Sequence, residues 1–84
     1  MLITNSALIE LLAIHNAQDV MVQVALNGNN SYILVLHNTP TTWNAIKYSV
    51  FDSEYEAQEK ADTLIKILKD YYEPTLIKYH VTQA

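Results

Sequence analysis

Three histidines are the only side chains in this sequence whose ordinary pKa lies near neutral pH: His15, His37 and His80. A histidine metal site needs close spacing on one element, such as His-x-x-x-His on a helix. The three residues stand far apart on three different predicted elements, and the chain has no cysteine to complete a ligand set. We therefore expect structural histidines, with no metal and no cofactor.

Serine nucleophiles are the second chemistry to consider. Ser31 or Ser49 could be combined with a histidine and an aspartate, but neither stands in a strand-to-helix elbow whose flanking glycines expose the hydroxyl to substrate. Ser53 does stand at a strand-to-helix junction, where its hydroxyl is expected to cap the helix instead. The single glycine, Gly28, belongs to a predicted hairpin. We expect a protein that is not an enzyme.

Five acidic side chains fall within eleven residues at the start of a predicted second helix: Asp52, Glu54, Glu56, Glu59 and Asp62. In one interpretation they form a solvated first turn that favours the positive end of the helix dipole. In the other, they dock on a basic, nucleic-acid-binding partner, which would make the chain an inhibitor or decoy. Small, arginine-poor acidic proteins of this build resemble accessory proteins of phages and mobile elements.

Aromatic side chains indicate contact surfaces. Six tyrosines are many for 84 residues, and tyrosine collects at interfaces because it offers a large contact area with a polar tip. Trp43 lies in a predicted polar loop over residues 38–44 and either anchors a partner or closes the end of the core. A pocket near Trp43, His37 and the hairpin would instead define a small ligand-binding protein or enzyme.

Charge and cysteine content exclude further classes of function. The net charge is −4, and all five cations are lysines; arginine supplies most bidentate contacts to bases and phosphates, so we expect no direct nucleic-acid binding. The predicted α-β-β-β-α order resembles that of double-stranded RNA-binding domains, but Glu54 and Glu56 replace the basic cluster that begins their second helix.

A small cysteine-free domain favours a reducing, cytoplasmic location. The apolar run 7–14 is too short for a membrane span, and no basic segment precedes it.

Hydrophobic periodicity predicts six elements. A helix over 5–16, capped by Asn5 or Ser6, is apolar on almost every side, and a second helix over 54–72 begins with a Ser53–Glu56 capping box. Alternation predicts four strands, over 20–26, 31–37, 45–51 and 76–81, with Asn27-Gly28-Asn29-Asn30 as a hairpin turn.

The sequence therefore predicts one α+β domain over 1–84, in the order α-β-β-β-α-β. Its fold is a two-layer α/β sandwich, in which both helices cover one face of a four-stranded, mixed, mostly antiparallel sheet. Strict alternation places the valines of the first strand with Ile33, Val35 and His37 on one face. It also places Ile46, Tyr48 and Val50 together on one face of the third strand.

Surplus apolar surface is the observation that leads to a function. A nearly all-apolar first helix and a sheet with apolar residues on both faces exceed what a two-layer domain can cover. We expect a protein-interaction or assembly module that self-associates, most simply as a homodimer, or that binds another protein, with no membrane contact. The predicted interface residues are Leu8, Leu11, Leu12, Ile14, Tyr32, Leu34 and Leu36.

Overall fold

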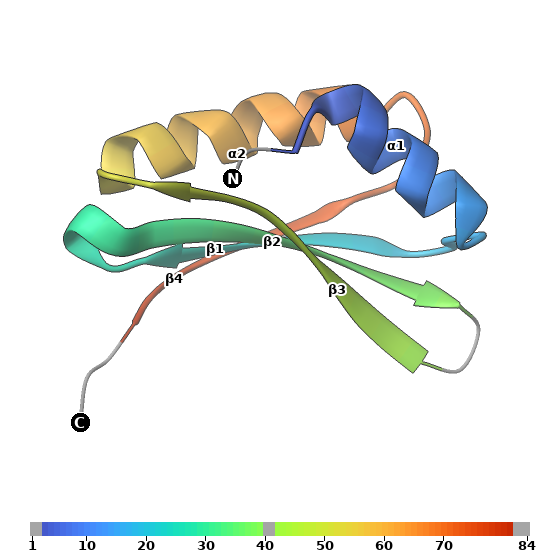
Figure 1. Ribbon diagram of the computed structural model, residues 1–84, viewed down its shortest axis with the longest axis horizontal. Helices are drawn as coiled ribbons and strands as arrows, with labels where there is room; N and C mark the ends of the chain where they lie inside the picture. The colour runs from blue at the N-terminus through green and yellow to red at the C-terminus, as the bar shows by residue number, and fades with distance from the viewer. Residues whose placement is uncertain (1–2, 40–41, 82–84) are drawn as a thin grey trace.

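The computed structural model describes residues 3–39 and 42–81 and confirms the predicted order of elements (Figure 1). The elements are α1 (Asn5–Ile14), β1 (Val20–Leu26), a 3₁₀ turn (Gly28–Asn30), β2 (Ser31–Thr39), β3 (Thr42–Phe51), α2 (Glu54–Leu68) and β4 (Thr75–His80). The second helix is shorter than predicted. The third strand begins earlier than predicted and includes Trp43, which the sequence placed in a loop.

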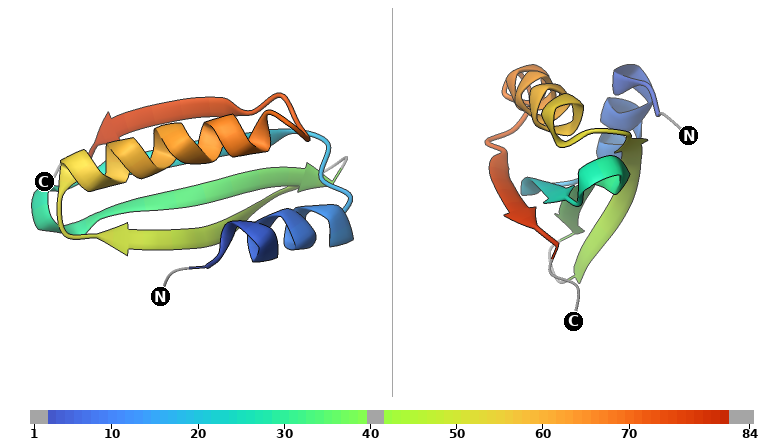
Figure 2. Two further views of the ribbon diagram at one scale, coloured as in Figure 1. Left: turned by 90° about the horizontal axis from the view of Figure 1, so that it is seen from above. Right: turned by 90° about the vertical axis from the view of Figure 1, so that its left-hand side faces the viewer.

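The four strands form one mixed sheet in the order β3-β2-β1-β4. β1 pairs with β2 and β2 with β3 in antiparallel fashion, whereas β1 and β4 are parallel. The parallel pairing follows from α2, which carries the chain across the sheet before β4 begins. Figure 2 shows both helices on one face, which confirms the predicted two-layer arrangement and leaves the opposite face of the sheet without a covering layer.

The core lies between the helices and the sheet. Alternate residues of β1 and β2 point toward the helices, and the inward stripes of α1 and α2 meet them. The fully covered apolar side chains of this core include Leu8, Leu12, Val22, Val24, Ile33, Val35, Ala57, Ala61 and Leu68.

The N-terminus of α1 is capped by a different residue than predicted, and its C-terminus is a Schellman motif. Thr4, rather than Asn5 or Ser6, is the cap, because its Oγ1 accepts from the Ala7 N–H at 3.1 Å. The helix ends where Asn16 adopts a positive φ of 52°. The Ala17 N–H then donates to the Leu12 carbonyl, as in a Schellman motif.

The start of α2 confirms the Ser53 cap, since the Ser53 Oγ accepts from the Glu56 N–H at 3.1 Å. The hairpin before it is also confirmed, and Gly28 has a φ of 57°. That region of φ costs glycine little, because it has no Cβ.

A β-bulge in β3 overturns the predicted alternation of the third strand. Ser49 pairs with Ile33 while Lys47 pairs with Leu34, so Tyr48 is an extra residue. Tyr48 and Ser49 are both buried, whereas Val50 is exposed on the uncovered side. Val50 therefore does not share a face with Tyr48, as strict alternation predicted.

Tyr48 ties β3 to the N-terminal segment. Its O–H donates to Asn5 Oδ1 at 2.6 Å, and its carbonyl accepts from the Ile3 N–H at 3.2 Å. Burial raises the pKa of the Tyr48 hydroxyl. The bulge is thus the point at which the first helix is joined to the sheet by hydrogen bonds.

Candidate interaction surface

Apolar side chains from all four strands gather on the uncovered face of the sheet, which we refer to as the open face. Residues that pair across neighbouring strands share a face, so the register assigns its members. They are Met21, Gln23, Ala25, Tyr32, Leu34, Leu36, Asn38, Trp43, Ala45, Lys47, Val50, Thr75, Ile77 and Tyr79.

The large exposed apolar side chains of the open face lie on its two edge strands. Trp43 and Val50 of β3 keep 49% and 45% of their surface accessible, and Ile77 and Tyr79 of β4 keep 38% each. Leu34 and Leu36 of the central strand β2 are half-buried. Isolated exposed apolar residues are ordinary, but a contiguous set on one face is typical of a contact surface.

Charge is almost absent from the open face. Among the described residues, Lys47 is its one charged side chain, and none of the four strands contains an aspartate or glutamate. The acidic residues lie on the helices and in the connecting segments. One of them, Asp19, borders the open face and is held by Asn38, whose Nδ2 donates to its carboxylate at 2.8 Å. A partner on this face would therefore meet a nearly neutral surface.

Two tyrosines cover the end of the open face near the hairpin. Ala25 pairs with Tyr32 on one side and with Tyr79 on the other, and Ala25 is fully buried although it faces away from the helices. Burial and the neighbouring Tyr32 hydroxyl raise the pKa of Tyr79. The two tyrosines therefore flank the small alanine on the open face.

The seven predicted interface residues separate into three groups. Tyr32, Leu34 and Leu36 lie together on the open face. Leu8 and Leu12 are fully buried in the core of this same chain, so their assignment to a surface is wrong. The half-buried Leu11 and the exposed Ile14 belong to α1, on the other side of the sheet.

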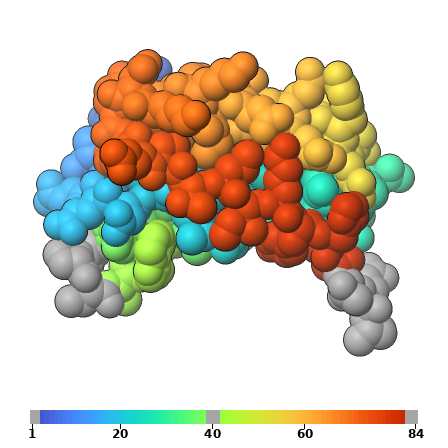
Figure 3. Space-filling model, turned by 180° about the vertical axis from the view of Figure 1, so that it is seen from behind, coloured from blue at the N-terminus to red at the C-terminus, as the bar shows by residue number. Residues whose placement is uncertain are grey.

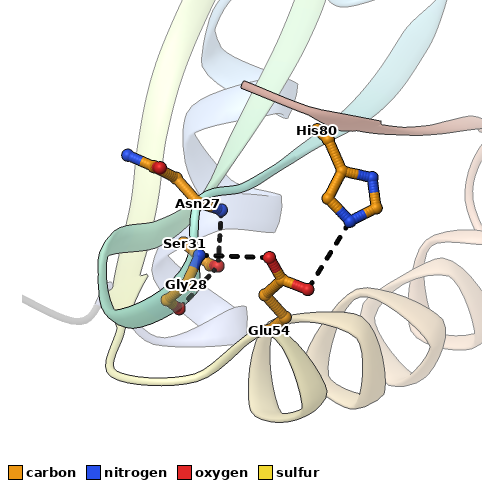
Figure 4. Close-up of polar contacts among 5 residues, drawn as sticks. All are labelled: Asn27, Gly28, Ser31, Glu54 and His80. Carbon is orange, nitrogen blue, oxygen red and sulfur yellow. Dashed lines mark hydrogen bonds and ion pairs between the residues drawn. The ribbon is translucent and has the colours of Figure 1, made fainter. Parts of the chain in front are cut away.

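The predicted acidic patch is partly engaged within the chain (Figure 4). Glu54 Oε1 accepts from the Gly28 N–H at 3.1 Å, and its Oε2 lies 3.6 Å from His80 Nε2. Asp62 forms an ion pair with Lys78 at 3.1 Å. Four members of the patch are exposed, namely Asp52, Glu56, Glu59 and the paired Asp62, and only Glu54 is half-buried.

Two of the histidines stack on one another. The ring centroids of His15 and His37 are 5.2 Å apart, with 29° between the planes. His37 is almost fully buried, and its Nδ1 has no hydrogen-bond partner among the described residues. Burial, together with the neighbouring His15, lowers the pKa of His37. Within residues 3–39 and 42–81, no group of three metal-ligating side chains comes together.

The features predicted to converge on a pocket do not meet. Trp43 faces the open side, while His37, one register position away, points toward the helices. The hairpin turn lies at the far end of β2. No pocket is found in the part of the chain that the structure describes.

Comparison with protein-family models, with curated proteins and with solved structures finds no match to this chain. Of the helices in the described segments, none is long and apolar enough to cross a membrane.

Proposed function

We propose that this chain is a non-enzymatic assembly module that associates with a second copy of itself through the open face. The observation that carries the proposal is the uncovered side of the sheet, where Trp43, Val50, Ile77 and Tyr79 are exposed beside a single charge. Covering such a surface removes apolar area from water, which is the main favourable term in association.

A second copy suits this face because the acidic residues of both chains, apart from Asp19 at its border, lie away from the contact. The chain carries a net charge of −4, and two such molecules repel one another wherever their acidic surfaces meet. Pairing through the open faces brings neutral surfaces together and leaves both α2 helices on the outside. A symmetric dimer also uses the same patch on each partner, so one apolar face is sufficient.

The size of the open face is consistent with a specific dimer. The longest and shortest dimensions of the molecule, 34 and 21 Å, bound the sheet as it is seen from above in the left-hand view of Figure 2. Together they enclose roughly 700 Å², close to the ~800 Å² that each partner contributes to an interface of standard size.

The acidic-decoy alternative has no comparable support, because Glu54 and Asp62 are engaged within the chain. The cysteine-free composition favours the cytoplasm as its place of action.

Sedimentation equilibrium over a range of micromolar concentrations tests the proposal. We expect the unaltered chain to form a dimer and Leu34→Lys to shift it toward monomer, because a charge at the centre of the contact is buried without a partner. Ile14→Lys makes the same kind of change on α1, away from the open face, and should leave the dimer intact.

Circular dichroism of each variant shows whether the fold is retained. A chain that sediments as a single copy at every concentration would overturn the proposal. A dimer that resists Leu34→Lys but dissociates with Ile14→Lys would place the contact on α1 instead.

A further inference from the structure

We infer that the two copies meet sheet against sheet, with the projecting corners of each open face seated in the receding corners of the other. The inference rests on the proposed function and specifies how the second copy occupies the face. The resulting dimer has four layers, with helices outside and two sheets at the centre.

The shape of the sheet is the first support. The sheet twists strongly, so its edge strands β3 and β4 cross in Figure 1. The start of β3 and the end of β4 project away from the helices, while the end of β3 and the start of β4 lie near them. In Figure 3, which views the molecule from behind, the coloured atoms of β3 (green) and of the end of β4 (red) reach lower than the cyan atoms between them. The open face is therefore a saddle.

Each corner of the saddle has a known residue. Trp43 is the second residue of β3 and stands at one projecting corner, and Tyr79 stands near the end of β4 at the other. Val50 near the end of β3 and Thr75 at the start of β4 mark the receding corners. The largest exposed aromatic side chains of the open face thus occur where the surface projects farthest.

Two copies of this saddle fit one another in an aligned packing. A two-fold axis between the layers, running along the strands or across them, exchanges projecting corners with receding ones. With the axis along the strands, the Trp43 corner of one copy lies over the Thr75 corner of the other; with the axis across the strands, it lies over the Val50 corner. In both cases the distance between the two sheets stays constant across the contact. Twisted sheets pack in this way, about 10 Å apart and within about 30° of parallel strand directions.

Pairing through sheet edges is less favourable in this molecule. The outer edge of β3 is closed at the bulge, where the Tyr48 carbonyl accepts from the Ile3 N–H. The outer edge of β4 is short and carries Lys78, and charged lysines on edge strands oppose pairing with another chain. Edge contacts would also leave the exposed apolar side chains of the open face in water.

The absence of cysteine from the chain allows a direct test with single-cysteine variants. Gln23→Cys lies near the centre of the open face, where any such two-fold axis brings the two copies together. Lys78→Cys marks the β4 edge, and Lys66→Cys marks the outer surface of α2. We expect a short cross-linker with two thiol-reactive groups, such as a bis-maleimide, to give covalent dimers with Gln23→Cys and not with the other two.

The outcomes separate the inference from the proposed function. If the unaltered chain sediments as a dimer but Lys78→Cys or Lys66→Cys is cross-linked in place of Gln23→Cys, this geometry is wrong and self-association stands. If the chain is monomeric, both fail.

The fluorescence of Trp43, the single tryptophan, tests the seating of the corners. Its emission should shift to shorter wavelength, and its quenching by acrylamide should decrease, as the dimer forms. Unchanged emission and quenching in a dimer cross-linked through Gln23→Cys would overturn the corner fit.

Discussion

Trp43→Ala should weaken the dimer strongly while changing the stability of the single folded chain little. Trp43 keeps 49% of its surface accessible, and since a large aromatic side chain can bury up to about 250 Å², roughly 120 Å² is left for a partner. At about 25 cal/mol per Å², complete coverage contributes about 3 kcal/mol from each copy. In a symmetric dimer the substitution removes this contribution twice.

A residue at a corner of the contact is covered only in part. Half coverage gives about 3 kcal/mol for the whole dimer, which raises the dissociation constant about 100-fold. Sedimentation equilibrium measures that change directly. Tyr55→Ala is the matched control, because Tyr55 is an even more exposed aromatic residue (65%) that lies on α2 rather than on the open face. Equal dissociation constants for Trp43→Ala and Tyr55→Ala would refute the reasoning.

Two further predictions concern buried polar groups. Because burial and His15 lower the pKa of His37 below 6.5, the unfolded chain binds this proton more readily. The free energy of unfolding should therefore decrease as the pH falls below about 6.5. Urea denaturation at several pH values and one protein concentration measures this decrease. His37→Gln should make the free energy of unfolding depend less on pH. An unchanged pH dependence in this variant would contradict the assignment of the effect to His37. Tyr48→Phe deletes the hydrogen bond to Asn5 and should lower the free energy of unfolding by about 1 kcal/mol. Urea denaturation of the unaltered chain and of the variant measures this difference. Coinciding midpoints would contradict the prediction.

Much of the fold could be predicted because the local patterns agree with the final packing. Strict alternation in β1 placed its valines on the helix side, and the same parity in β2 placed Tyr32, Leu34 and Leu36 on the other. The Ser53 cap was also evident, since its partner is only three residues away. These features depend on neighbours in the sequence, which is why the sequence alone was sufficient.

Features that depend on distant partners were not predictable. The bulge at Tyr48 has no local signal, because its hydroxyl is satisfied by Asn5 from the first helix. One extra residue then moved Val50 to the open face. Likewise α1 is apolar on nearly all sides, so its sequence did not distinguish the buried Leu8 and Leu12 from the exposed Ile14.

The open face was foreseeable as a surplus of apolar residues, but its boundaries were not. Trp43 seemed to belong to a loop because Pro40 and several threonines surround it. β3 instead begins at Thr42, and pairing with Asn38 directs the Trp43 side chain to the uncovered side. Strand pairing, rather than local propensity, decided the orientation of this residue.

The parallel pairing of β1 with β4 has a consequence for the order in which the molecule folds. Met21 pairs with Thr75, so the intervening meander and α2 must be synthesised before this edge of the sheet can form. The meander β1-β2-β3 needs only short loops and can assemble first, whereas closing a long loop carries a greater entropic cost. Until α2 and β4 dock, one side of β1 offers free backbone groups to other nascent chains. Slow translation through the last third of the sequence would prolong that interval and favour aggregation.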